Sequence, residues 1–143
     1  MLFSMIALIL VMIFTQVEIT LNVLWVPIIF LELYIFSLGL GFILSASTVF
    51  FRDIQYLWGV FTSIWMYLTP IIYPVSIISQ EYRWWYDNFN PMVNYVEQFR
   101  DVILNGQCLS IDSLCQGFII SIILLLVGIW FFNRKENEFI LYI

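Results

Sequence analysis

Histidine is absent from this chain of 143 residues, and charged side chains are few. Five basic and ten acidic residues make up only 10% of the sequence, whereas a soluble domain usually carries about 25%. Without histidine the chain lacks the commonest general base and the commonest metal ligand. It also has no basic stripe that would bind nucleic acid. These shortages argue against an enzyme, a metal centre and a nucleic-acid partner.

Cysteine is equally scarce, with Cys108 and Cys115 as the only two. They do not form a Cys-x-x-Cys pair, and two thiols without histidine make a poor zinc site. The simplest interpretation is two ordinary residues near a membrane face. A disulfide between them would require an oxidising compartment on that side.

Long apolar runs are what the sequence has in abundance: 63% of the residues are hydrophobic and the mean hydropathy is +0.98. A membrane-spanning helix takes roughly 20 apolar residues. The runs predict an all-α integral membrane protein with about four transmembrane helices, in a single transmembrane domain over residues 1–143. The predicted spans are 1–14, 27–50, 55–73 and 114–132.

The first run, 1–14, is short for a span. As a helix it would rise about 21 Å, less than the ~30 Å of the hydrocarbon core. A signal peptide could be this short, but no basic residue precedes the run and no small-x-small cleavage site follows it. We therefore interpret the run as the remainder of a spanning helix.

The loop between the last two predicted spans contains a helix of its own. Asn90-Pro91 suits a helix start, with asparagine as N-cap and proline in the first position, and Asn105-Gly106 is a stop signal. At about 13 residues it is too short to span, so we expect a short re-entrant or interfacial helix. Its predicted apolar face consists of Met92, Val96, Phe99 and Ile103, with Val93 and Val102 alongside.

One charged pair, Arg52-Asp53, separates the second and third apolar runs. Basic residues favour the cytoplasmic side of a membrane. Arg52 falls on the same predicted side as Arg134 and Lys135, which follow the last span. The opposite side holds Arg83 and Arg100. We therefore predict that Arg52 and both termini are cytoplasmic.

The second predicted span has small residues at every fourth position: Ser37, Gly41 and Ser45. Small residues at this spacing let another helix approach closely in lipid, although they also occur by chance. We expect this face to pack against another helix, within the chain or across a homodimer. Glu32 is the one acid in the span, and we expect it to avoid facing lipid as an ionised carboxylate.

Aromatic side chains fill the third predicted span, which closes on Pro70 and Pro74. An interfacial aromatic belt explains those at its ends, but Trp65 lies near its middle. Pro70 removes a helix hydrogen bond and Pro74 ends the element. A helix broken at membrane depth is tolerated only where protein or water satisfies its freed backbone. The break is either a harmless kink or a movable mouth at the outer face.

These motifs occur in an order that resembles a known family. They are Gly-Leu-Gly followed by Val49-Phe-Phe-Arg-Asp53, then Thr69-Pro-Ile-Ile-Tyr-Pro74, then Asn90-Pro-Met with Glu97-Gln-Phe-Arg-Asp-Val-Ile-Leu-Asn-Gly106. Together they are similar to the C-terminal half of a type-2 ABC exporter permease, in the group that exports O-antigen, teichoic acid and other polysaccharides. The family's N-terminal spans and main coupling helix would precede residue 1. A fragment, a split gene product or a degenerate copy is therefore expected.

The resemblance implies a role for each motif. Arg52 and Asp53 would form a cytoplasmic coupling turn close to an ATPase subunit. The segment 74–106 would form short re-entrant gate helices at the outer mouth. The outer-gate residues would be Pro70, Tyr73, Pro74, Asn90, Pro91 and Arg100. The aromatic channel lining would include Tyr56, Trp65, Tyr67 and Tyr73.

The resemblance also implies a multi-pass permease in the bacterial plasma membrane that exports a lipid-linked polysaccharide. Two six-helix subunits would form the channel, surrounded by membrane lipid and driven by two separate ATPase subunits. The chain has no Gly-x-x-x-x-Gly-Lys loop, so the partner would use the ATP and this chain would bind no cofactor. The alternatives are a drug or small-molecule exporter of the same superfamily and a structural membrane subunit that moves no substrate. Mid-span aromatics favour sugar, because flat rings stack on pyranose faces.

Overall fold

The computed structural model describes residues 21–71, 73 and 77–136, and all regular structure in these residues is helical. The predicted all-α class is confirmed for this part of the chain, whereas the predicted span over 1–14 lies outside it. The elements are, in order, η1 (Leu21–Trp25), α2 (Val26–Phe50), α3 (Ile54–Leu68), α4 (Gln80–Phe89), α5 (Pro91–Ile103) and α6 (Ile111–Glu136).

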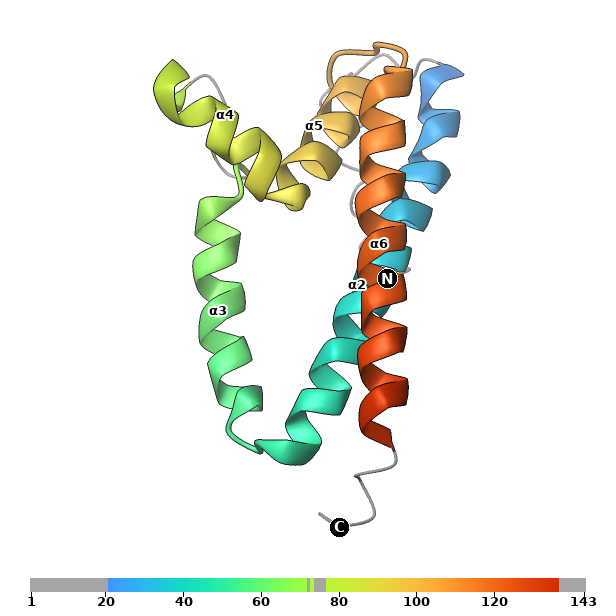
Figure 1. Cartoon of the computed structure of the whole chain (residues 1–143). Helices are drawn as coiled ribbons and strands as arrows, with labels where there is room; N and C mark the ends of the chain where they lie inside the picture. The colour runs from blue at the N-terminus through green and yellow to red at the C-terminus, as the bar shows by residue number, and fades with distance from the viewer. Residues whose placement is uncertain (1–20, 72, 74–76, 137–143) are drawn as a thin grey trace, which may run out of the picture.

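Two helical stretches are long and apolar enough to cross a bilayer, Asn22–Phe50 and α6. α2 carries Pro27 in its first turn, where the missing N–H leaves no hydrogen bond unmade. It ends where Phe51 adopts an extended backbone ahead of the charged turn. α2 and α6 lie side by side and run in the same direction, so both begin at one end of the molecule (Figure 1).

The contact between α2 and α6 depends on residues with little or no side chain. A Cβ placed on Gly39 would lie 2.7 Å from the backbone carbonyl carbon of Leu124. A Cβ on Gly128 would lie 2.5 Å from the carbonyl oxygen of Gly39. Ala46, two turns further along α2, is fully buried. The two backbones are therefore as close as glycine permits, and in lipid such packing favours helix association.

α3 stands apart from α6 and forms the other arm of the molecule (Figure 1). It has 15 residues, which corresponds to about 22 Å, and it is not among the stretches long enough to span alone. The predicted helical extent to residue 73 is wrong at its end. The helix stops at Leu68 because Thr69 is extended, the conformation favoured before a proline. No residue of α3 is buried.

Two short helices, α4 and α5, lie at the end of the molecule where α2 and α6 begin (Figure 1). α5 confirms the helix predicted after Asn90: the Asn90 side chain accepts a hydrogen bond from the Met92 N–H, Pro91 occupies the first turn, and the helix ends at Ile103. Gly106 then adopts a φ of 59°, which glycine tolerates best.

The predicted apolar face of α5 is only partly correct. Met92, Val96 and Phe99 are half-buried. The fully buried positions include Tyr95 and Gln98, because α5 docks on polar groups of α2 and α6. The buried residues of α5 are Val93, Tyr95, Gln98, Val102 and Ile103.

The two ends of the molecule separate the cations as predicted. The α2–α3 turn, with Arg52, lies at the same end as the C-terminus of α6 (Figure 1). There the Lys135 ammonium lies 4.9 Å from the ring centroid of Phe50. Arg100 belongs to α5 at the opposite end. The grouping of Arg52 with the end of α6 is confirmed, and its cytoplasmic location stays a prediction.

Candidate functional site

The C-terminal end of α3 is fastened to α5 by the side chain of Asn90. Its Oδ1 accepts hydrogen bonds from the indole N–H of Trp65 at 2.8 Å and from the backbone N–H of Met92 at 3.2 Å. Its Nδ2 donates to Thr69 Oγ1 at 3.2 Å and to the carbonyl of Leu68 at 3.4 Å. One amide therefore caps α5 and holds the end of α3 at the same time.

Arg100, near the end of α5, holds the segment that follows α3. Its guanidinium donates to the carbonyls of Ile71 at 3.0 Å and Tyr73 at 3.3 Å. Pro70 cannot donate to a helix ladder and ends the helix, so these carbonyls lack helical partners. Arg100 supplies the partners of both carbonyls.

We call Thr69, Pro70, Tyr73, Asn90 and Arg100 the gate cluster. Thr69 and Pro70 are buried, and the Tyr73 hydroxyl donates to the carbonyl of Tyr67 at 3.1 Å. The structure thus brings together four of the six residues predicted for the outer gate. Pro91 is the adjoining first residue of α5, and Pro74 lies outside the described residues.

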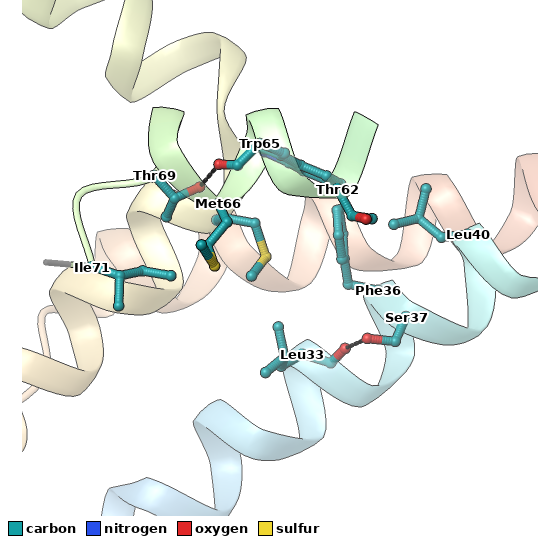
Figure 2. Close-up of a pocket in the computed structure, with 10 residues that line it drawn as sticks. Leu33, Phe36, Ser37, Leu40, Thr62, Trp65, Met66, Thr69 and Ile71 are labelled. Atoms are coloured by element: carbon teal, nitrogen blue, oxygen red, sulfur yellow. Dashed lines mark hydrogen bonds between the residues drawn. The ribbon is translucent and has the colours of Figure 1, made fainter. Parts of the chain in front are cut away.

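A cavity of about 370 Å³ lies between α2 and α3, next to the gate cluster. Figure 2 shows side chains of both helices pointing into it, with Trp65 opposite Phe36 and Thr69 and Ile71 at one end. The Trp65 and Phe36 rings meet edge-on at a centroid distance of 6.1 Å. Most of the lining is apolar, so the cavity suits an apolar group better than a charged one.

The predicted channel aromatics do not share one environment. Trp65 is half-buried, lines the cavity and uses its N–H on Asn90. Tyr56 and Tyr67 are 77% and 68% exposed and lie away from the cavity. Of these three residues only Trp65 faces α2.

The charged turn at the other end is open. Arg52 and Asp53 form a two-residue turn directly between α2 and α3, and both side chains are exposed. Asp53 precedes α3 but its carboxylate does not cap the helix. Among the described residues, neither side chain takes part in a hydrogen bond or ion pair. Both are therefore available to a group outside this part of the chain.

The small-residue face of α2 predicted for packing lies beside the contact that the structure shows. A Cβ placed on Gly41 would have no atom within 4 Å, whereas one placed on Gly39 would meet the backbone of α6. Ser37, Gly41 and Ser45 instead border an open groove with Phe132. Ser37 also lines the cavity toward α3, but within the described residues no helix packs directly on Gly41. Packing across a homodimer therefore stays a prediction.

A buried polar cluster joins α2, α5 and α6, and of its members only Glu32 was singled out from the sequence. The Tyr95 hydroxyl and Ser121 Oγ are 2.7 Å apart, and Ser121 donates to the carbonyl of Glu32 at 3.0 Å. Gln98 donates to the carbonyl of Ser113 at 2.9 Å. Burial raises the pKa of the Tyr95 hydroxyl, which therefore stays neutral. For Glu32 and Ser121 the signal in the sequence is a polar side chain in an otherwise apolar run, whereas Gln98 stands among other polar residues of α5.

Both cysteines are free and exposed. Cys108 lies in the loop before α6 and Cys115 in the first turns of α6, at the end of the molecule that holds the gate cluster. The structure therefore shows two separate thiols rather than a disulfide.

The two helices of bilayer length indicate a membrane protein. Residues 1–104 match the family model of the ABC-2 type transporters. The chain therefore belongs to the ABC-2 type transporter family.

Relatives with curated names agree with this family. The chain is 30% identical over 121 residues to the O-antigen export system permease protein RfbA of Klebsiella pneumoniae, an alignment that covers 84% of this chain and 46% of that protein. It is 29% identical over 121 residues to a protein of the same name from Myxococcus xanthus, with the same coverage of each chain. The chain thus spans about half the length of the curated relatives that it matches.

Proposed function

We propose that this chain is a permease subunit, or the C-terminal part of one, in an ATP-driven exporter of lipid-linked polysaccharide or another cell-surface polymer. The observation that carries the proposal is the similarity, over 84% of the chain, to proteins named as O-antigen export permeases. The composition supports it, because long apolar helices without histidine offer a path through a membrane rather than catalytic groups.

In the proposed topology four helices cross the bacterial plasma membrane and 1–143 forms one transmembrane domain. α2 and α6 have the required length. α3 would cross together with the segment that follows it, and 1–14 would supply the remaining crossing. The end with Arg52, Arg134 and Lys135 would face the cytoplasm. α4 and α5 would then be re-entrant elements at the outer face.

The proposed partners are those that the family resemblance implies, and the exposed surfaces offer places for them. The Arg52-Asp53 turn would contact an ABC ATPase subunit, which uses the ATP, so this chain would need no cofactor. A second permease copy would cover the face of Ser37, Gly41 and Ser45. Membrane lipid would cover the remaining apolar surface of α3 and α6.

The gate cluster would provide the moving part. Pushing on a two-residue turn displaces both helices attached to it, and α3 carries that displacement to its outer end. There Asn90 and Arg100 make the hydrogen bonds that, among the described residues, attach Leu68, Thr69, Ile71 and Tyr73 to α5. Opening would release these contacts and let the outer end of α3 move from α5.

Two conservative substitutions test the coupling role of the turn. Arg52→Lys keeps the positive charge that sets topology but loses the planar guanidinium that pairs bidentately. Asp53→Asn removes a charge that contributes little to topology. We expect both variants to reach normal abundance and to show reduced export and reduced substrate-stimulated ATP hydrolysis in a reconstituted complex. If both variants keep full coupling, the turn only anchors the chain at the membrane surface.

The apolar cavity favours a second candidate, an exporter of drugs or other apolar small molecules. The same reconstituted complex separates the two, because a polymer exporter is stimulated by lipid-linked polysaccharide and a drug exporter by apolar compounds. A complex whose ATP hydrolysis responds to neither substrate would instead indicate a structural subunit.

A further inference from the structure

Glu32 is the most unusual side chain in the bundle. It is an acid inside a bilayer-length helix, and none of its surface is exposed. Both carboxylate oxygens are buried without a hydrogen-bond partner. The side-chain oxygen of Gln98, which is 2% exposed, is the one other buried side-chain atom without a partner in the described part of the chain.

The side chains of Glu32 and Gln98 meet over one glycine of α6. A Cβ added to Gly117 would collide with Oε2 of Glu32 and would lie 3.2 Å from Nε2 of Gln98. Gly117 therefore leaves the space in which the acid from α2 and the amide from α5 meet. The amide nitrogen of Gln98 donates one of its two N–H groups to the carbonyl of Ser113, and the amide oxygen is buried without a donor.

Within the part of the chain that the structure describes, no positive charge compensates the acid. On α5 the one titratable side chain in the cluster is Tyr95, whose hydroxyl is engaged with Ser121. On α6 the residues against Glu32 are Gly117 and Ser121, neither of which titrates. The guanidinium of Arg100 is bound to the carbonyls after α3. An ionised carboxylate buried without a partner costs far more than a neutral acid.

We propose that Glu32 is a protonated carboxylic acid whose O–H donates to Oε1 of Gln98, tying α2 to α5 across Gly117. An ionised carboxylate only accepts hydrogen bonds, whereas the protonated form also donates one. The O–H satisfies one oxygen of Glu32 and the unpartnered oxygen of Gln98 together. The hydrogen bond from Gln98 to Ser113 is unchanged, so α5 is attached to α2 and α6 at one point.

This bond makes Glu32 a positioning residue for α5. Part of the gate cluster belongs to α5 and part to the end of α3. A movement of α3 separates the two parts only if α5 keeps its position. This consequence rests on the proposed function. The protonation of Glu32 and its bond to Gln98 do not, and they are measured without transport.

The test is infrared spectroscopy on the chain in lipid bilayers at neutral pH. We expect the carbonyl band of a protonated carboxylic acid in the wild type and its loss in Glu32→Gln. Glu81→Gln, which replaces an exposed acid on α4, is the matched control and should leave the band unchanged. Absence of the band from the wild type, or its persistence in Glu32→Gln, would overturn the proposal.

Stability measurements provide a second readout that separates the neutral acid from an ionised one. Glu32→Gln preserves a neutral donor and acceptor, so the unfolding equilibrium should stay close to that of the wild type. Glu32→Leu leaves Gln98 without its partner and should shift the equilibrium about tenfold or more toward unfolding. If Glu32 is ionised, both variants should stabilise the bundle, because each removes a buried charge.

Gln98→Leu tests the partner. If the bond exists, Glu32→Leu and Gln98→Leu should be non-additive, because the second substitution removes a partner that is already lost. Additive effects would contradict a direct bond. An exporter that fails to transport while the infrared band and the non-additivity remain would count against the proposed function alone.

Discussion

Among the helices that contact α2, α6 and α3 do so in different ways. Against α6 it brings glycine to glycine, with Gly39 and Gly128 leaving no room for a Cβ. Against α3 it has the short turn at one end and the cavity of about 370 Å³ between the two helices. No residue of α3 is buried, although its sequence is largely apolar and richer in aromatic residues than that of α6.

The difference shows that apolar composition does not decide which helices pair in a membrane. Lipid tails are as apolar as leucine, so small residues and polar contacts determine the pairing. α6 is held along its length by glycines and by the polar cluster around Ser121. α3 is held at its ends, by the turn after Phe50 and by Asn90. A helix fixed only at its ends can move as one unit.

The largest expected effect comes from filling the close α2–α6 contact. Gly39→Leu should destabilise the bundle by about 3 kcal/mol or prevent its folding, because the new side chain meets backbone that cannot move aside. The measurement is the free energy of unfolding in bilayers or detergent. Gly41→Leu is the matched control on the same helix, and equal losses in both variants would contradict the asymmetry between these two faces.

Removing the Asn90 side chain should have the next largest effect. Asn90→Ala loses the cap of α5, which is worth about 1 kcal/mol. It also leaves the indole N–H of the half-buried Trp65 without its acceptor, which costs about 1 kcal/mol more. Hydrogen exchange should accelerate in the first turn of α5 and at the end of α3. Asn105→Ala, at an exposed position, should leave both segments protected. Unchanged exchange in Asn90→Ala would show that the attachment lies elsewhere.

Gly41→Leu should matter between subunits. If the face of Ser37, Gly41 and Ser45 meets a second copy, the variant should weaken self-association by roughly 1–2 kcal/mol while the fold of the single chain is kept. The dimer dissociation constant in bilayers measures this. A dissociation constant equal to that of the wild type would indicate that lipid covers this face.

The smallest expected effect is that of Arg100→Lys. Both hydrogen bonds come from Nη2 of Arg100. The shorter lysine keeps the charge but not the planar N–H groups that make these bonds, so the local stability of the segment after α3 should fall by about 1 kcal/mol. Exchange of the amides around Ile71 reports this, because its own N–H is bonded to Thr69. Wild-type protection in this variant would assign the segment's stability to Asn90 alone.

Local rules predicted much of the fold. Hydropathy located α2 and α6, and the Asn90-Pro91 start located α5, because both signals lie within a few residues. The end of α3 was set too late, because the preference of Thr69 for extended backbone outweighed the apolar run that continues beyond it.

The contacts between distant residues were not predictable in the same way. Asn90 was recognised as a cap, but its bonds to Trp65 and Thr69 connect residues more than 20 positions apart. Gly39 and Gly41 look alike in sequence. Gly39 is the one in close contact because α6 packs on the side of α2 where Gly39 lies. Glu32 was singled out as an acid in a span, whereas its partner Gln98 was not, because glutamine on a short helix normally faces water.

The central claim is that the outer end of α3 moves away from α5 during export. Ile71→Cys combined with Met92→Cys places thiols on both sides of this contact, since both residues line the same cavities. Cys108→Ser and Cys115→Ser remove the native thiols. A reducible bis-thiol reagent should then stop export in the reconstituted complex, and reductant should restore it, while each single-cysteine variant continues to export. Full export with the two sites linked would contradict the account.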